Sequence, residues 1–136
     1  MSKILVTKKF YTYNINEHPC SYNHGMVTIH ANGDVGFCPT LSRIFGNINT
    51  LPFEKIVHNL YSSEFMKLTI GDIKGCLKCK YLRICGGGCR ADALYINNDI
   101  HVEDSFACAG MKVLEQLLDL FPRKLKNELH KYVKSE

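Results

Sequence analysis

Two short apolar segments around Asn32 and Gly33 form the clearest local pattern of hydrophobic and polar positions in the chain. The segments Met26–Ala31 and Val35–Pro39 are rich in β-branched and aromatic residues. An Asn-Gly dipeptide between such segments suits the positive φ angles of a tight hairpin turn. We therefore predict a β-hairpin here, with Cys38 on the returning strand.

Much of the rest of the chain alternates between apolar residues at helical spacing and residues that favour turns. This pattern predicts a helix with Pro52 in its first turn, a short helix capped by Ser62 or Ser63, and a short helix over residues 90–96. It also predicts a longer helix over about residues 105–120, capped by Asp104 or Ser105, and a last helix that starts at Pro122. The first helix has an apolar stripe that we expect in the core, made of Phe53, Ile56, Val57, Leu60 and Tyr61. The 105–120 helix has an apolar face made of Phe106, Val113, Leu114, Leu117, Leu118 and Phe121. The composition of residues 4–13 predicts an extended segment, and that of residues 46–50 predicts a turn. The predicted fold class is α+β, a small β-hairpin followed by several short helices and cysteine-bearing loops.

The length of 136 residues and the hydrophobic content of 46% predict one domain with a modest core. We expect this domain in residues 1–110, and a C-terminal helical extension packed on it in residues 111–136. The formal charge of +4 is scattered and gives no reason to expect a nucleic-acid partner. No stretch approaches the length of a membrane span, and the N-terminal apolar run is too short for a signal peptide. The expectation is a cytoplasmic protein.

Seven cysteines are the strongest chemical signal in the sequence. Four of them, Cys76, Cys79, Cys85 and Cys89, follow the spacing C-x2-C-x5-C-x3-C, and three glycines precede the last. Such a group is typical of a metal or cluster site, or of a disulfide knot. An odd number of cysteines and a reducing compartment favour metal or cluster binding. The glycines allow the backbone to wrap closely and to direct N–H groups at sulfur.

Three further cysteines complete a recognisable order. The series Cys20-x12-Gly33-x4-Cys38, then Cys76-x2-Cys79-x5-Cys85-x3-Cys89, then Cys108 resembles the seven-cysteine signature of SPASM domains. These are the C-terminal auxiliary-cluster domains of many radical SAM enzymes that modify peptides and proteins. The run Cys-Gly-Gly-Gly-Cys-Arg-Ala is similar to the family as well. The resemblance extends over roughly residues 18–110.

The resemblance implies that the chain is organised around two [4Fe–4S] clusters with interleaved ligands. One cluster would be bound by Cys76, Cys79, Cys85 and Cys108, and the other by Cys20, Cys38 and Cys89. About seven to eight irons per chain would follow. Some family members carry an eighth cysteine where this chain has Asn14. The candidates for the fourth ligand of the second cluster are therefore His18, His24, Asp34, water and a substrate group.

The radical-generating cluster of this superfamily is bound by C-x3-C-x2-C. This chain has Asp92 where the third cysteine would follow Cys85-x3-Cys89, and it is too short for a βα barrel. We therefore do not expect the chain alone to cleave S-adenosylmethionine. The resemblance implies an auxiliary module, free-standing or a fragment of a larger maturase, that binds a peptide substrate or relays electrons. Its partner would be a radical SAM core, in cis or as a separate chain. Two alternatives are a structural zinc protein and an iron–sulfur enzyme that acts through an open iron.

Overall fold

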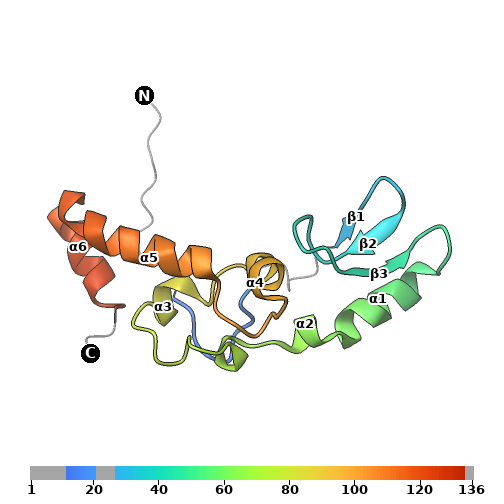
Figure 1. Ribbon diagram of the computed structural model, residues 1–136, viewed down its shortest axis with the longest axis horizontal. Coiled ribbons are helices and arrows are strands. Elements are labelled where there is room, and N and C mark those ends of the chain that lie inside the picture. Colours follow the sequence, from blue (N-terminus) through green and yellow to red (C-terminus); the bar gives the residue numbers. More distant parts are fainter. Residues whose placement is uncertain (1–11, 21–26, 134–136) are drawn as a thin grey trace.

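The computed structural model describes residues 12–20 and 27–133 of the chain. Its elements follow in the order β1 (Thr28–Ile29), β2 (Asp34–Gly36), β3 (Ile44–Asn47), α1 (Phe53–Ser62), α2 (Glu64–Lys67), the 3-10 helix η2 (Ile70–Asp72), α3 (Leu82–Cys85), α4 (Arg90–Asn97), α5 (Ser105–Leu117), the 3-10 helix η3 (Leu118–Leu120) and α6 (Arg123–His130). The sheet and α1 lie at one end of an elongated molecule, and α5 and α6 at the other (Figure 1). The predicted α+β class is confirmed. The extended segment predicted for residues 4–13 lies almost entirely outside the described residues.

The predicted hairpin is present as β1 and β2, which pair antiparallel with Ile29 opposite Val35. Its turn differs from the prediction, because Gly33 has a φ of 89° whereas Asn32 has a negative φ. The N–H of Gly33 donates to the carbonyl of His30 at 2.9 Å, so one left-handed residue is enough to close the turn. Strand β2 ends at Gly36, which leaves Cys38 beyond the strand and not on it as predicted.

The third strand, β3, was missed by the sequence pattern, which indicated a turn over residues 46–50. Gly46 lies opposite Val35 in an antiparallel pair. A Cβ atom at Gly46 would lie 2.8 Å from Cγ1 of Ile56 on α1, so the absent side chain allows α1 to pack closely on the sheet. A glycine reads as a turn residue in a sequence, but here it marks the closest approach of helix and sheet.

The main core lies between the sheet, α1, α2 and α4. Its buried members are Phe37, Cys38, Leu41, Leu60, Phe65, Leu68, Ala91 and Ile100. The rings of Phe37 and Phe65 meet edge to face, with centroids 4.4 Å apart. Of the stripe predicted for α1, Ile56 and Leu60 are buried, whereas Phe53 and Tyr61 are about half exposed. The predicted face is therefore wider than the part that packs.

Helix α5 begins at Ser105 and is capped by Asp104, one of the two residues predicted for this cap. None of its own residues is fully buried. Phe106 and Val113, on the predicted apolar face of this helix, are 67% and 51% exposed, so they are not packed in the described part of the chain. The opposite side of α5 faces a small apolar space between α3 and α6, next to the buried Leu118 and Leu129. Within residues 12–20 and 27–133, α3 and α6 line this space on one side of α5, and Phe106 and Val113 are not among its lining residues.

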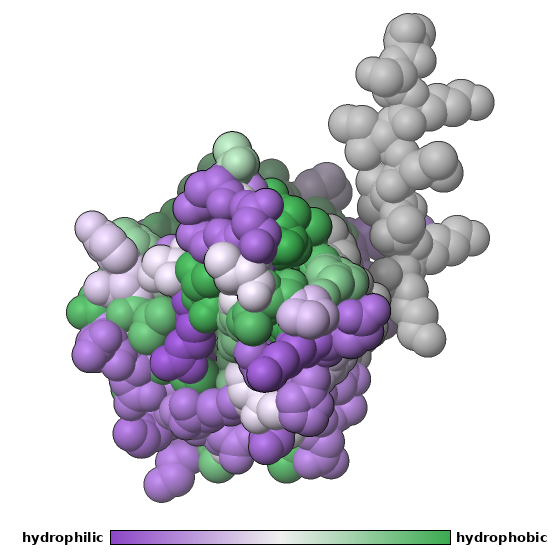
Figure 2. Space-filling view, turned by 90° about the vertical axis from the view of Figure 1, so that its right-hand side faces the viewer, coloured by the Kyte–Doolittle hydropathy of each residue, from purple (hydrophilic) through white to green (hydrophobic). Residues whose placement is uncertain are grey.

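None of the helices within the described ranges is long and apolar enough to cross a membrane. Figure 2 shows the sheet end of the molecule, where hydrophobic side chains form separate patches among hydrophilic ones. Ile29, Ile44 and Ile48 are the half-exposed isoleucines of the hairpin, β3 and the following turn. Scattered apolar side chains of this kind are ordinary on a protein surface.

Candidate metal centre

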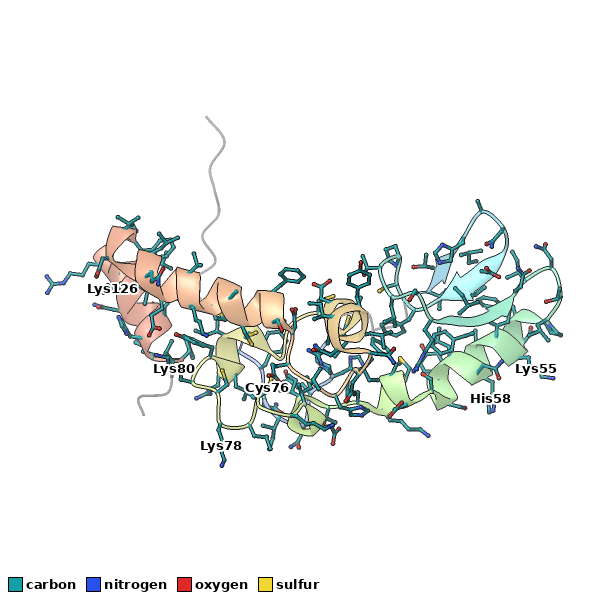
Figure 3. All side chains as sticks on the ribbon, viewed as in Figure 1. Lys55, His58, Cys76, Lys78, Lys80 and Lys126 are labelled. Carbon is teal, nitrogen blue, oxygen red and sulfur yellow. The ribbon has the colours of Figure 1, made fainter. Side chains whose placement is uncertain are left out.

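Four cysteines from three separate segments line one cavity of about 480 Å³. Cys76 and Cys79 come from the loop before α3, Cys85 ends α3, and Cys108 lies in the second turn of α5. Figure 3 shows Cys76 in the middle of the molecule, between α3 and α4, whereas the neighbouring Lys78 points outward. The structure thus brings together the four cysteines that the resemblance assigns to one cluster.

The thiols of this cavity influence one another. The pKa of the Cys76 thiol is raised to about 11, mainly by burial. The nearby Arg90 lowers this pKa, and Cys108, Cys85 and Cys79 raise it. Burial is also the main cause that raises the pKa of Cys85 and of Cys108. Several thiolates at one buried place repel each other. A multiply charged metal group would remove that repulsion, and its binding would release protons.

The Gly86–Gly88 loop is shaped around the sulfur of Cys85. The backbone N–H groups of Gly87 and Gly88 donate hydrogen bonds to this sulfur and so lower the pKa of Cys85 against the effect of burial. All three glycines have positive φ angles, of 65°, 91° and 75°. The prediction that the loop directs N–H groups at sulfur is confirmed. Hydrogen bonds to sulfur are one of the factors that set the potential of an iron–sulfur cluster.

Asp104 connects the two ends of the cysteine-rich region. Its Oδ1 accepts the N–H groups of Phe106 and Ala107, and its Oδ2 accepts the N–H of Cys89 at 2.8 Å. The side chain is buried, at 3% exposure. The sequence offers Asp104 as one of two candidates for the helix cap, but no sequence signal indicates its contact with Cys89, fifteen residues earlier.

The three cysteines assigned to the second cluster lie in different surroundings. Cys38 is buried, and Cys20 packs against the same apolar core. The sulfur of Cys38 accepts the N–H of Leu41 at 3.3 Å and lies at the same distance from the hydroxyl of Thr40. Cys89 is exposed. Two of the three share one core, and the third lies on the loop after Gly88.

Among the described residues, no group of three or more His, Cys, Asp or Glu side chains has the geometry to hold a single metal ion. Thiolates around one Zn²⁺ lie close together, because each Zn–S bond is only about 2.3 Å long. Thiolates around an iron–sulfur cube bind different irons, so they lie around a larger object. A cavity with four thiols, hydrogen-bond donors to sulfur and an apolar wall of Tyr81 and Leu82 fits such a group.

Two of the candidates for a fourth ligand of the second cluster have other partners. Both ring nitrogens of His18 contact backbone groups: Nε2 lies 2.8 Å from the carbonyl oxygen of Phe65, and Nδ1 accepts the N–H of Cys20 at 3.1 Å. Asp34 accepts hydrogen bonds from the amides of Asn47 and Asn32, which lower the pKa of its carboxyl group. His24 lies outside the described residues.

A second cavity, of about 550 Å³, lies between α4 and the segment that leads into β3. It is more open and more polar than the cysteine cavity, and it is lined by Thr40, Ser42, Arg43, Ile44, Ala91, Leu94, Tyr95 and Asn98. Thr40 also contacts the sulfur of Cys38, and Ala91 follows Cys89 by two residues. This cavity is therefore adjacent in the chain to two of the three cysteines assigned to the second cluster.

The SPASM family of iron–sulfur cluster-binding domains matches the chain over residues 20–80. These residues are thus similar to a SPASM domain. The match includes Cys20, Cys38, Cys76 and Cys79, and it stops before the glycine loop and α5. SPASM domains bind iron–sulfur clusters and usually occur in radical SAM enzymes. Neither the curated proteins nor the solved structures gave a match to this chain.

Proposed function

We propose that this chain is an auxiliary iron–sulfur module that binds two [4Fe–4S] clusters and serves a radical SAM core, in cis or as a separate chain. The single observation that supports this most is the cavity lined by Cys76, Cys79, Cys85 and Cys108. The family match reaches only the first two of these cysteines. The fold adds Cys85 and Cys108 at the same place, independently of the match.

For the first cluster we propose these four cysteines as its complete ligand set. Soft thiolate ligands suit iron–sulfur clusters. The N–H groups of Gly87 and Gly88 already point at the Cys85 sulfur, and Tyr81 and Leu82 line the same cavity. A bound cluster supplies one-electron chemistry, and this chain's residues determine its position and its access to water.

For the second cluster we propose Cys20, Cys38 and Cys89. Cys38 and Cys20 share one core, and the hydrogen bond from Leu41 to the Cys38 sulfur resembles those made by the glycine loop to Cys85. Cys89 is exposed, so it has room to move toward these two thiols when metal binds. The backbone contacts of His18 and the amide hydrogen bonds of Asp34 make these two residues poor fourth ligands. His24, which lies outside the described residues, water and a substrate group remain the candidates.

We further propose that the module relays electrons or binds a peptide substrate next to the radical SAM core. The open cavity beside Thr40 and Ala91 gives a substrate access to the region of the second cluster. Residues 1–110 would form the cluster-binding unit, and residues 111–136 its helical extension. Helix α5 crosses the boundary between them, so we expect the two parts to unfold together.

Anaerobic purification followed by iron and sulfide analysis tests this proposal. The unaltered chain should contain about seven to eight irons and an equal amount of sulfide, with EPR signals of reduced [4Fe–4S] clusters. Cys76→Ser and Cys108→Ser should each remove one cluster, about half of the iron. Ser105→Ala is the matched control, because Ser105 lines the same cavity without a thiol.

Three other results would change the conclusion. Zinc in place of iron and sulfide would favour the structural zinc protein. Full iron in both Cys76→Ser and Cys108→Ser would remove the proposed ligand set. Loss of all iron in Cys76→Ser would show that the two clusters assemble only together.

A further inference from the structure

Arg90 carries its charge in the protein interior, where a buried charge costs free energy. It follows Cys89 directly, and only 1% of its surface is exposed. One terminal nitrogen, Nη1, donates to the carbonyl oxygens of Ile100 and Val102, both at 2.7 Å, and Nη2 donates to the carbonyl of Gly87. These neutral acceptors hold the guanidinium in place but do not balance its charge.

No carboxylate in the described part of the chain forms an ion pair with Arg90. Desolvation lowers the pKa of the guanidinium, and the groups that oppose this effect are Cys76, Asp104, Cys89 and Cys85, in that order. Three of these four are thiols assigned here to clusters. The negative groups that act on Arg90 are therefore the buried carboxylate of Asp104 and thiols that become anionic when metal binds.

One donor of the guanidinium is also unused. Nε of Arg90 is the one buried side-chain nitrogen or oxygen within residues 12–20 and 27–133 that has no hydrogen-bond partner. A buried donor without a partner costs about 1–3 kcal/mol. A protein keeps such a donor where a bound ligand supplies the missing acceptor, or where the positive charge of the side chain is needed.

We propose that Arg90 is the buried counter-charge of the cluster thiolates and that it raises the reduction potential of the clusters bound by this chain. A fixed positive charge in a low-dielectric interior stabilises the more negative, reduced state of a nearby cluster. The inference rests on the proposed cluster binding and adds a positioning and tuning role for a residue that is itself not a ligand.

Because Arg90 lies between the two ligand sets, its charge should act on both proposed clusters. Arg90 follows Cys89 of the second set directly in the chain, and its Nη2 donates to the carbonyl of Gly87, in the loop that follows Cys85 of the first set. Its hydrogen bond to Gly87 also holds the loop whose N–H groups reach the Cys85 sulfur. Loss of the charge should therefore lower the potentials of both clusters, and not of one alone.

The test compares Arg90→Gln with Arg83→Gln in the anaerobically loaded chain. Arg83 lies two residues before Cys85, but its side chain is exposed, so water and salt screen its charge. Midpoint potentials are read from a dye-mediated titration followed by EPR, with iron content measured on the same samples. We expect more negative midpoints in Arg90→Gln and unchanged midpoints in Arg83→Gln.

Arg90→Lys separates charge from hydrogen bonding. The lysine keeps the positive charge but lacks the guanidinium group that donates to the carbonyls of both Ile100 and Val102. We expect Arg90→Lys to have a lower melting temperature but midpoints near those of the unaltered chain. If Arg90→Gln does not load iron, Arg90→Lys decides: restored loading with near-normal midpoints supports the proposal, and a failure equal to that of Arg90→Gln overturns it.

The proposal is also overturned if fully loaded Arg90→Gln has the midpoints of the unaltered chain, or if Arg83→Gln shifts them as much. Such results would leave cluster binding itself intact. By contrast, an unaltered chain that binds no iron and sulfide would refute the proposed function, so the two failures are distinguishable.

Discussion

The backbone N–H of Cys89 donates a 2.8 Å hydrogen bond to Oδ2 of Asp104, the residue whose other oxygen caps α5. One buried carboxylate thus fixes the loop that ends in Cys89 against the helix that carries Cys108. Those two cysteines are assigned to different clusters. The hydrogen bond therefore joins the two proposed ligand sets through protein alone.

Replacing Asp104 tests this connection. Asp104→Asn keeps an oxygen for the cap of α5, but its NH2 group faces the N–H of Cys89, so this part-buried donor loses its acceptor. We expect the free energy of unfolding to fall by about 1–3 kcal/mol, and the Cys89 cluster to lose iron first. Asp104→Ala should cost about 1 kcal/mol more because the cap is lost as well.

Urea unfolding and iron analysis on the same samples measure both effects. Asp92→Asn in α4 is the control, because it removes a carboxylate three residues from Cys89 that makes no hydrogen bond in the described part of the chain. An Asp104→Asn protein with the stability and iron content of the unaltered chain would show that the contact has no structural weight.

The sequence predicts those features of the fold that depend on local pattern. The hairpin, α4, the Asp104 cap of α5 and the glycine loop are all local, and all are present. Strand β3 was missed because Gly46 looks like a turn residue until Ile56 packs against it. The buried position of Arg90 was missed because its acceptors, the carbonyls of Ile100 and Val102, are ten and twelve residues away.

Gly88 and Gly110 form a matched pair for a second prediction. A Cβ atom at Gly88 would lie 2.7 Å from the side chains of Ala107 and Asp104, and its φ of 75° is unfavourable for other residues. A Cβ atom at Gly110, within α5, would meet nothing within 4 Å.

We therefore expect Gly88→Ala to destabilise the chain by more than about 1 kcal/mol, from backbone strain and the clash together. Gly110→Ala should stabilise it by about 0.5–1 kcal/mol through helix propensity. Thermal melting of the loaded proteins measures both. Equal shifts in the two variants would contradict the close packing of the loop on α5.

His18 gives a third prediction, which separates a structural histidine from a ligand. Its ring bridges the backbone of Cys20 and Phe65 and meets the Phe65 ring edge to face at 5.3 Å. His18→Ala should lower the free energy of unfolding by about 1–3 kcal/mol through the loss of these contacts. Iron content and EPR signals should stay unchanged.

His58 provides the control, because it is exposed on α1 and points away from the core (Figure 3). His58→Ala should change stability by less than about 0.5 kcal/mol. A His18→Ala protein that loses the signal of one cluster would instead identify His18 as a ligand and would correct the assignment made here.

Removal of the clusters should affect the two ends of the molecule differently. Among the described residues, the core between the sheet, α1, α2 and α4 has eight buried members. The apolar cluster next to Cys76 is smaller, with Ile70, Ile73 and Leu82 buried beside that cysteine and Tyr13 packed against them. The cysteine region therefore depends more on bound metal for its folding.

After chelation of iron under oxidising conditions, we expect a lower melting temperature and fast amide exchange in residues 75–90 and 104–110. Exchange in β2, β3 and α1 should stay slow, as expected for elements held by their own core. Uniform loss of protection along the chain would show instead that the clusters stabilise the whole fold, and unchanged protection around Cys76 would show that the cavity forms without them.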